Sequence, residues 1–333
     1  MSQDVANQIA QHFTDYLNEW HSIPEVFDNE LDAQLHRWYA EVKPVFPKKP
    51  YFSPSSINSC QRELYLKTIG AKKDNFPRPP YQARWTRIGT AIGDIIQRDL
   101  LIAERHYERL TGKPAPFVFE RDEQGRPMFE DFAKRNVPVH YRGHTFYLYG
   151  APDGIMRYIT PDGEVIRIGL EVKSKQTSAS KTSVYSMNEA ELKHVKQTIG
   201  YSKMYDVDYY LILYVNAAKK AWVYSDSDFE KNPDIRAFGL HFTEADREQL
   251  YEYVADILDA VKAKKPPALD LTKWTFNNFK TASALSLTDD EFDEIKTYVR
   301  RVLKSGLPNH EKEQTLDAYE FIKEIREKED VIR

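Results

Sequence analysis

The feature that most constrains the fold is a predicted β-hairpin near the middle of the chain. Two runs rich in β-branched residues and tyrosine, 154–159 and 164–173, flank the sequence TPDG at 160–163, which is typical of a tight turn. Further strand patterns occur at 117–119, 137–149, 209–216 and 221–224, and helical spacing of apolar residues occurs within 1–45, 86–105, 188–205 and 243–263. This order predicts an α/β fold in which a central mixed β-sheet is flanked by helices.

Composition divides the 333 residues into three expected parts: a helical N-terminal extension (1–48), a core (49–265) and a helical, acidic C-terminal extension (266–333). Between residues 48 and 87 there are nine Lys or Arg against two acids, although the net charge of the chain is −4. A regional excess of this kind suits phosphate binding, but charge clusters more often form solvated surface.

The single cysteine, Cys60, excludes an intramolecular disulfide and any four-cysteine zinc or iron–sulfur site built by one chain. A metal ion is therefore expected to be held mainly by oxygen ligands, which favours Mg²⁺ or Mn²⁺. Neither a signal peptide nor a membrane-spanning apolar run is evident, so we expect a cytoplasmic protein without a membrane partner. No phosphate-binding Gly-rich loop, G-x-S-x-G or H-E-x-x-H sequence supports an NTPase, an α/β-hydrolase or a metalloprotease.

The hairpin is expected to gather charged side chains on one face. If it is symmetric about residue 162, Asp153 lies opposite Glu171, and Lys173 lies on the same face two residues further on. Two opposed carboxylates repel each other unless something neutralises them. The hairpin alone is equally compatible with a divalent-cation site and with an ion pair between Lys173 and one of the acids.

Pro152-Asp153 followed by Glu171-Val172-Lys173 on the next strand resembles the pattern of the PD-(D/E)XK nuclease superfamily. Two more segments are similar to motifs of its RecB-like exonuclease branch, which includes CRISPR-associated and phage or repair exonucleases. Residues 197–201, QTIGY, resemble the Q-x-x-x-Y motif, and residues 55–62, SSINSCQR, resemble the segment S-x-[IL]-x-x-C-x-R. The resemblance extends over roughly residues 50 to 225 and leaves both ends of the chain unexplained.

The resemblance implies a restriction-endonuclease-like sheet and metal-dependent hydrolysis of DNA phosphodiesters. It implies that Asp153, Glu171 and Lys173 are catalytic, and that Asp153, Glu171 and the backbone carbonyl of Val172 hold Mg²⁺ or Mn²⁺. Expected substrate contacts are Gln197, Tyr201, Arg62, Lys175, Lys193 and Lys196, with Trp85, Tyr185 and Tyr201 as residues on which unpaired bases stack.

The sequence departs from the related motif G-x-x-x-H-x-x-x-E, in which the histidine and the acid help to hold metal. Residues 89–97 read GTAIGDIIQ, so Gly93 replaces the histidine and Gln97 replaces the acid. Gln97 offers only a neutral oxygen, and Asp94 is turned by about 100° around the helix. In several relatives the cysteine of the S-x-[IL]-x-x-C-x-R segment is the first ligand of an iron–sulfur cluster, which three C-terminal cysteines complete. This chain lacks those three cysteines, so we expect no cluster, and Cys60 is expected to be a packing residue.

The favoured hypothesis is a DNA exonuclease acting in recombination, repair or phage DNA processing. One alternative is a nuclease fold with weak or no activity that serves as a DNA-binding or assembly module, as the residues at 93 and 97 suggest. Another is a structure-specific endonuclease. DNA is the expected partner, together with a second copy of the chain or a recombination or repair protein.

Overall fold

The computed structural model describes residues 2–332, with side chains up to residue 328. The chain divides into two compact units, each assembled from separate stretches of sequence. The first unit contains the residues up to 55, 78–139 and 146–250, and the second contains 56–77, 140–145 and the residues from 251 onward. The three-part division expected from composition stays a prediction.

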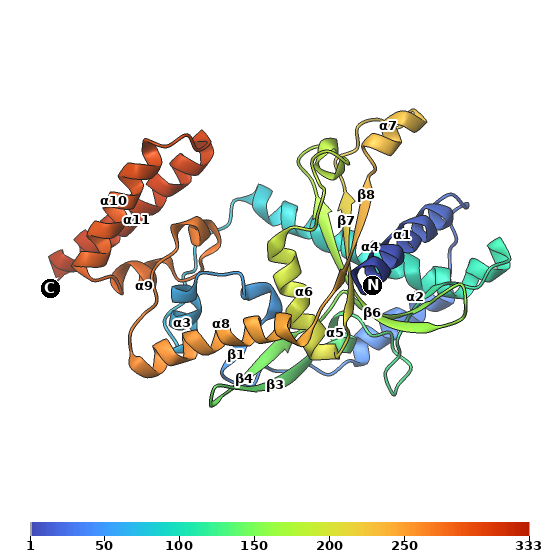
Figure 1. The fold of residues 1–333 in the computed structure, drawn as a ribbon, viewed down its shortest axis with the longest axis horizontal. Helices are drawn as coiled ribbons and strands as arrows, with labels where there is room; N and C mark the ends of the chain where they lie inside the picture. Colours follow the sequence, from blue (N-terminus) through green and yellow to red (C-terminus); the bar gives the residue numbers. More distant parts are fainter. Residues whose placement is uncertain (1, 333) are drawn as a thin grey trace. The chain divides into compact units, whose positions relative to one another are not determined.

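The first unit is built on a five-stranded mixed sheet (Figure 1). The strand order is β2 (Phe117–Phe119), β5 (Gly154–Ile159), β6 (Val165–Lys175), β7 (Tyr209–Asn216) and β8 (Ile235–His241). β6 and β7 are parallel, whereas the other neighbouring pairs are antiparallel. A smaller sheet has the order β1 (Tyr51–Phe52), β4 (His144–Gly150) and β3 (Arg135–Tyr141). The predicted fold class, a mixed sheet flanked by helices, is confirmed.

The hairpin of β5 and β6 has the predicted register. Gly154 pairs with Leu170 and Ile159 pairs with Val165, so the centre of symmetry is residue 162. Gly163 closes the turn with φ of +85°, a conformation that favours glycine. Asp153 lies one residue before β5, and the same register places it opposite Glu171.

Helices cover both faces of the sheet. On one face, α1 (Ser2–His21) and α4 (Pro80–Thr111) bury residues such as Phe13 and Leu100 against Leu170 and Leu213 of the sheet. On the other face, α6 (Leu192–Tyr205) packs Val195 against Ile212 and Tyr214. The remaining helices associated with this unit are α2 (Asn29–Glu41), η1 (Pro54–Ser56), α5 (Glu130–Ala133), η2 (Ala179–Thr182), α7 (Asp226–Lys231) and the first turns of α8 (Glu244–Ala263).

One sequence prediction about secondary structure is wrong. Residues 221–224 form no strand: Trp222 and Val223 are exposed, and no neighbouring strand pairs with them. Aromatic and apolar content alone therefore does not identify a strand where no partner strand is available.

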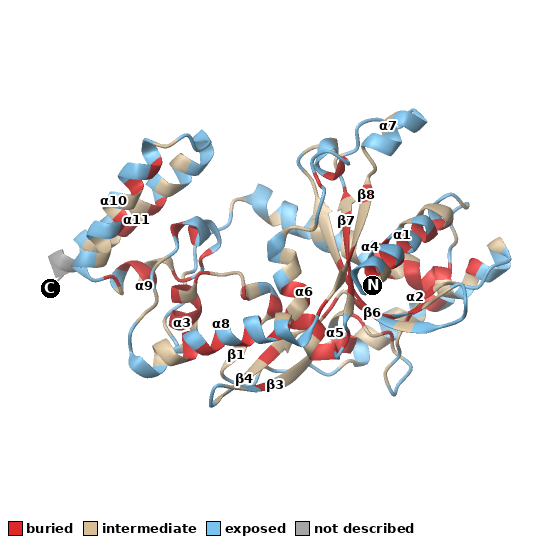
Figure 2. Ribbon diagram, in the orientation of Figure 1, coloured by how far each residue is buried: buried red, intermediate tan, exposed pale blue. Residues whose placement is uncertain are grey.

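The second unit is helical and has a small core of its own. It contains α3 (Gln61–Thr68), η3 (Leu271–Phe276), α9 (Lys280–Leu285), α10 (Asp289–Leu303) and α11 (Asn309–Ile332). Its core residues include Trp274, Ala284, Ile295 and Ile322. Figure 2 shows that buried residues form only a narrow stripe along α10 and α11. Cys60 is buried in this unit and its sulfur accepts a hydrogen bond from the backbone N–H of Asp270 at 3.3 Å, which confirms the predicted packing role.

In the described part of the chain, no helix combines the length and the apolar character needed to cross a membrane.

A glycine in β6, Gly169, makes room for the ring of an aromatic residue on β7. A Cβ atom on Gly169 would lie 2.0 Å from Cε2 of Tyr210, and Tyr210 is fully buried and cannot move aside. We therefore expect Gly169→Ala to lower the free energy of unfolding by about 1–3 kcal/mol or more, measured by urea denaturation. The matched control is Gly93→Ala in α4, where no heavy atom lies within 4 Å. It is expected to stabilise by about 0.5–1 kcal/mol, and similar effects at both positions would contradict the packing argument.

Candidate functional site

The central strand β6 presents three charged side chains on one face of the sheet. Glu171, Lys173 and Lys175 alternate along the strand and face the side covered by α6, whereas Leu170 and Val172 pack into the core on the other side. Because β6 lies in the middle of the sheet, Glu171 is only 2% exposed. The fold therefore holds a carboxylate inside the protein, where it is stable only with suitable partners.

The predicted catalytic residues lie together. The backbone N–H of Val172 donates a hydrogen bond to Oδ2 of Asp153 at 2.7 Å. Oε1 of Glu171 accepts a hydrogen bond from Nε2 of Gln197 at 2.7 Å, and the ammonium of Lys173 pairs with the same oxygen. Gln197 reaches the site because it lies on the buried side of α6. Asp153, Glu171, Lys173 and Gln197 thus form one connected polar cluster.

Burial and mutual repulsion raise the proton affinity of the two acids. Burial and the nearby Glu171 raise the pKa of Asp153 to about 7, although Lys173 and the Val172 N–H act in the opposite direction. Burial likewise raises the pKa of Glu171, while Lys173 and Gln197 oppose the increase. Burial lowers the pKa of Lys173, but the attraction of both carboxylates outweighs it and the net shift is upward. One ammonium does not fully neutralise the two buried acids.

These shifts predict how stability changes with pH when divalent cations are removed by a chelator. The pKa of Asp153 is raised from 3.8 to about 7, so the folded protein binds more protons than the unfolded chain between these values. The stabilising contribution is complete below pH 3.8 and is lost as the pH rises through about 7. Urea denaturation should show a decrease in stability between about pH 4 and pH 7 that is smaller in Asp153→Asn. An identical decrease in both proteins would contradict the assignment.

The donor groups of this cluster fit a hard divalent cation. Oε2 of Glu171 is buried and has no hydrogen-bond partner among the described residues. The C=O of a strand residue points to the same edge as its N–H, so the Val172 carbonyl is on the side of Asp153. Within residues 2–328, no group of three or more His, Cys, Asp or Glu side chains is arranged to hold a metal ion. The oxygen atoms of this cluster that could hold a cation are those of Asp153, Glu171 and the Val172 carbonyl, and water would complete its coordination.

Gln97, which replaces the acid of the related motif, is 2% exposed and faces the site from α4. Its Nε2 donates a hydrogen bond to the backbone carbonyl of Asp153 at 2.9 Å. This bond assigns Gln97 a clear structural contact, in which it fixes the backbone that carries Asp153. Direct ligation of metal by Gln97 stays a prediction.

Two further acidic residues influence Asp153: Asp94, which the sequence placed on the neighbouring helix, and Glu130, which the sequence did not identify. Asp94 adds to the upward shift in the pKa of Asp153. The pKa of Glu130 is raised by burial and by Asp94 and Asp153, and Oε2 of Glu130 accepts a hydrogen bond from the hydroxyl of Tyr39 at 2.8 Å. Glu130 has φ of +45°, which is unusual for a residue other than glycine. Tyr39 and Glu130 belong to no motif of the resemblance, so no sequence signal pointed to them.

The other predicted substrate contacts are placed differently from one another. Tyr201 is buried, and burial together with Glu171 and Asp153 raises the pKa of its hydroxyl, which stays neutral. Arg62 belongs to the second unit and its side chain is 0% exposed. Its guanidinium donates hydrogen bonds to the carbonyls of Pro267 at 2.6 Å and Ser286 at 3.2 Å and pairs with Glu291. These bonds leave no free guanidinium for the predicted phosphate contact.

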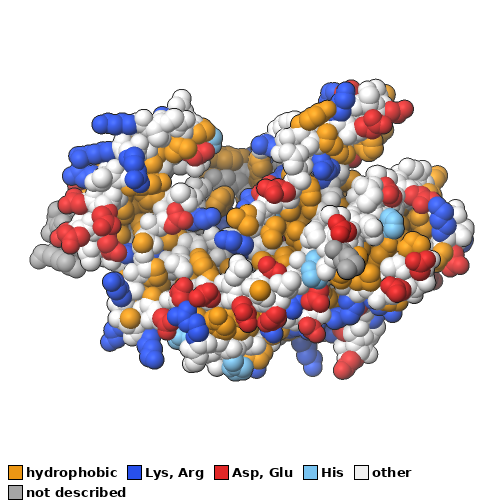
Figure 3. Space-filling view, viewed as in Figure 1, with side chains coloured by type: hydrophobic (Ala, Val, Ile, Leu, Met, Phe, Trp, Pro, Cys, Tyr) orange, Lys and Arg blue, Asp and Glu red, His pale blue; other side chains and the backbone are white. Residues whose placement is uncertain are grey.

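A polar cavity of about 580 Å³ lies where β6 ends and α6 begins. Its lining includes three of the predicted DNA contacts, Lys175, Lys193 and the stacking residue Trp85, and also Lys181. Lys196 is exposed on α6 and is not part of this lining. Figure 3 shows basic, acidic and apolar side chains intermixed over the face in view, so local lysine groups rather than a uniformly basic surface are available for phosphate.

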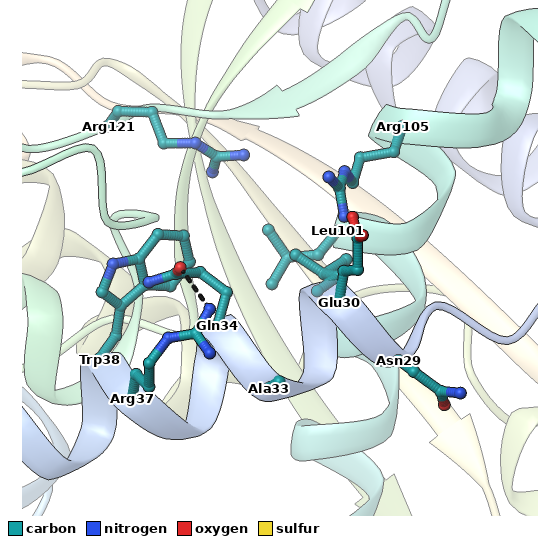
Figure 4. Close-up of a pocket in the computed structure, with 10 residues that line it drawn as sticks. Asn29, Glu30, Ala33, Gln34, Arg37, Trp38, Leu101, Arg105 and Arg121 are labelled. Carbon is teal, nitrogen blue, oxygen red and sulfur yellow. Dashed lines mark hydrogen bonds between the residues drawn. The ribbon is translucent and has the colours of Figure 1, made fainter.

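A second cavity of about 620 Å³ lies between α2 and α4 (Figure 4). Arg37, Arg105 and Arg121 extend around it, and Nη2 of Arg37 donates a hydrogen bond to the side chain of Gln34 at 2.8 Å. None of the predicted catalytic or substrate-binding residues lines this cavity. The cluster around Glu171 is therefore the candidate site.

Comparison with known proteins gives distant structural similarities. No family model matches the sequence, and no curated protein matches it. Similar solved structures include SSO0001 (TM-score 0.39, 12% identity, 78% of this chain and 96% of that chain). They also include the alkaline exonuclease LHK-Exo from Laribacter hongkongensis (TM-score 0.37, 11% identity, 69% of this chain and 93% of that chain). A phage-related exonuclease from Haemophilus somnus is similar at 0.33 and 12%, covering 65% of this chain and 94% of that chain.

Proposed function

We propose that the chain is a Mg²⁺- or Mn²⁺-dependent deoxyribonuclease that hydrolyses phosphodiester bonds as an exonuclease. The observation that carries the proposal is the state of Glu171. Its carboxylate is buried on the central strand, one oxygen is held by Lys173 and Gln197, and the other has no partner among the described residues. A purely structural ion pair has no reason to leave a buried carboxylate oxygen unsatisfied opposite a second acid.

The side chains of the cluster have separate roles in this proposal. A divalent cation held by Asp153, Glu171 and the Val172 carbonyl would supply positive charge next to the scissile phosphate and promote deprotonation of water. The ammonium of Lys173 orients the attacking water and stabilises negative charge that develops on the phosphate. Gln197 holds the Glu171 carboxylate in one orientation, and Gln97 holds the backbone of Asp153.

DNA binding and biological context belong to the same proposal. Lys175 and Lys193 line the adjacent cavity, and Lys196 lies on the exposed side of α6, where each is suited to contact the phosphate backbone. Tyr201 borders the cluster from α6. The proposed process is recombination, repair or phage DNA processing in the cytoplasm. The proposed protein partner is a second copy of the chain or a recombination or repair protein.

The test is degradation of end-labelled linear DNA and of closed circular DNA by the purified protein in Mg²⁺, Mn²⁺ or a chelator. An exonuclease degrades linear DNA only when the metal is present and leaves circles intact, whereas Asp153→Asn is inactive. Cleavage of circles would instead identify an endonuclease. Equal, background-level degradation by the wild type and Asp153→Asn would refute the enzymatic proposal.

A DNA-binding or assembly module without strong activity is the second candidate. The observation that favours it is the replacement of two potential metal-binding residues by Gly93 and Gln97, of which Gln97 uses its amide nitrogen for the Asp153 backbone. This candidate predicts DNA binding without metal-dependent degradation in the same experiment.

A further inference from the structure

The cavity next to the candidate site contains an ion-pair bridge that no catalytic role explains. Three lysines line the cavity, Lys175, Lys181 and Lys193, together with two acids, Glu189 and Glu191. Lys175 lies two residues after Lys173 on β6, so its side chain leaves the sheet on the same face. The cavity is therefore a direct continuation of the candidate site along the strand.

Glu191 uses both carboxylate oxygens on two different lysines. Oε1 pairs with the ammonium of Lys175, and Oε2 lies 3.0 Å from Nζ of Lys193. A phosphate group presents oxygens with similar charge and spacing, so it would satisfy the same two ammonium groups. The carboxylate of Glu191 thus lies where an anionic ligand of this cavity would be bound.

The position of Glu191 is fixed by its backbone rather than by its carboxylate. Its backbone N–H donates a hydrogen bond to the hydroxyl of Tyr214 at 2.9 Å. Glu191 directly precedes α6, and its side chain makes no capping hydrogen bond to the helix. The carboxylate can therefore leave the lysines without breaking the start of α6.

The two lysines experience strong mutual repulsion without an anion between them. Lys175 is half-buried beside the ring of Tyr214, with Nζ 5.0 Å from the ring centroid. Burial and the neighbouring Lys193 and Lys181 lower the pKa of Lys175 to about 8. In the free protein the carboxylate of Glu191 offsets this repulsion, and a cavity of about 580 Å³ leaves space for an anion larger than a carboxylate.

We propose that this cavity binds a phosphate group of a nucleic-acid strand, and that Glu191 occupies the phosphate position in the free protein as an intramolecular competitor. This inference rests on the proposed function because it identifies the substrate contact beside that site. Binding of the strand displaces the Glu191 carboxylate from Lys175 and Lys193, which weakens affinity and favours release of the strand after cleavage.

The experiment measures binding without catalysis, using a fluorescent single-stranded oligonucleotide in a chelator. Glu191→Gln keeps the side-chain size and removes its charge, so we expect binding about 3- to 10-fold tighter than in the wild type. The slope of log affinity against log salt should become steeper by about one phosphate contact. Glu189→Gln is the matched control, because Glu189 lines the same cavity and forms no ion pair with a lysine among the described residues.

A double substitution shows whether the gain in affinity of Glu191→Gln depends on the ion pair between Glu191 and Lys175. Lys175→Met should weaken binding, and adding Glu191→Gln to it should recover little of the loss. Equal gains for Glu189→Gln and Glu191→Gln would overturn the inference, since they would reflect net charge alone. No gain in Glu191→Gln would also overturn it, with Glu191→Ala and thermal melting used to detect a folding defect.

Inorganic phosphate distinguishes the source of the ligand. Competition by inorganic phosphate that is stronger in Glu191→Gln, together with tighter oligonucleotide binding, supports a strand phosphate; competition without tighter oligonucleotide binding contradicts it. Because no divalent cation is present, the result is independent of hydrolysis. A protein that never cleaves DNA can still show the gain, and an active nuclease can lack it, so failure of either proposal is recognisable.

Discussion

Replacement of Lys173 by alanine is expected to reduce the rate of DNA hydrolysis by about 100- to 1,000-fold, the typical effect of removing one preorganised electrostatic contact in an active site. In the folded protein the ammonium of Lys173 pairs with Glu171 and attracts Asp153. Its removal also leaves two buried acids without a cation, so stability in a chelator should fall as well. Rates are measured on end-labelled linear DNA with saturating Mn²⁺, and stability is measured by urea denaturation.

The matched control for Lys173→Ala is Lys113→Ala. Lys113 also pairs with a glutamate, Glu19, at 2.8 Å, but its side chain is 65% exposed. Exposed ion pairs of this kind contribute little, so the control should retain wild-type activity and nearly wild-type stability. Activity of Lys173→Ala within a few fold of the control would show that Lys173 has only a structural role.

Replacement of Arg62 by alanine is expected to cause the largest loss of stability, about 3–5 kcal/mol, because it breaks a buried charge pair. The guanidinium is 0% exposed and joins three separate parts of the second unit: the carbonyl of Pro267, the carbonyl and hydroxyl of Ser286, and the carboxylate of Glu291. Urea or thermal denaturation measures the loss. A loss below about 1 kcal/mol would contradict the assignment of Arg62 as a central connection.

Arg142→Ala is the matched control for Arg62→Ala within the same unit. Arg142 pairs with Asp256 and Asp259 at 2.6 Å each, but it lies at the surface and should affect stability much less. DNA binding by the folded fraction of Arg62→Ala separates the structural role from the phosphate contact suggested by the sequence. A salt-dependence slope equal to that of the wild type supports a purely structural role.

The sequence was sufficient to predict the centre of the site because the hairpin has a regular period. Once the turn at 160–163 was identified, the register placed Asp153 opposite Glu171 and put Lys173 on the same face, and the pairing of Gly154 with Leu170 confirms that register. The position of Gln197 beside β6 was expected only from the resemblance of residues 197–201 to the Q-x-x-x-Y motif, and its side chain does bind Glu171. The register argument uses only local geometry, which a sequence specifies directly.

Other contacts depend on tertiary packing that no local pattern encodes. Gln97 binds the backbone of Asp153 across 56 positions of sequence, and Tyr39 reaches Glu130 across 91. The buried position of Arg62 depends on the segments near 267, 286 and 291, which join it only after the chain has folded. Linear boundaries could not reveal the two units, because each is assembled from non-adjacent stretches.

The candidate site depends on the unequal lengths of β5 and β6. The ladder between them stops at Gly154 and Leu170, but β6 continues to Lys175. Along this overhang the edge of β6 facing β5 is not used by a neighbouring backbone, and a side chain, Asp153, takes the N–H of Val172 instead. If β5 were two residues longer, its backbone would pair with this part of β6 as in the rest of the sheet. The candidate site therefore lies where β6 has no partner in β5, and it exists because the β5–β6 ladder ends at Gly154.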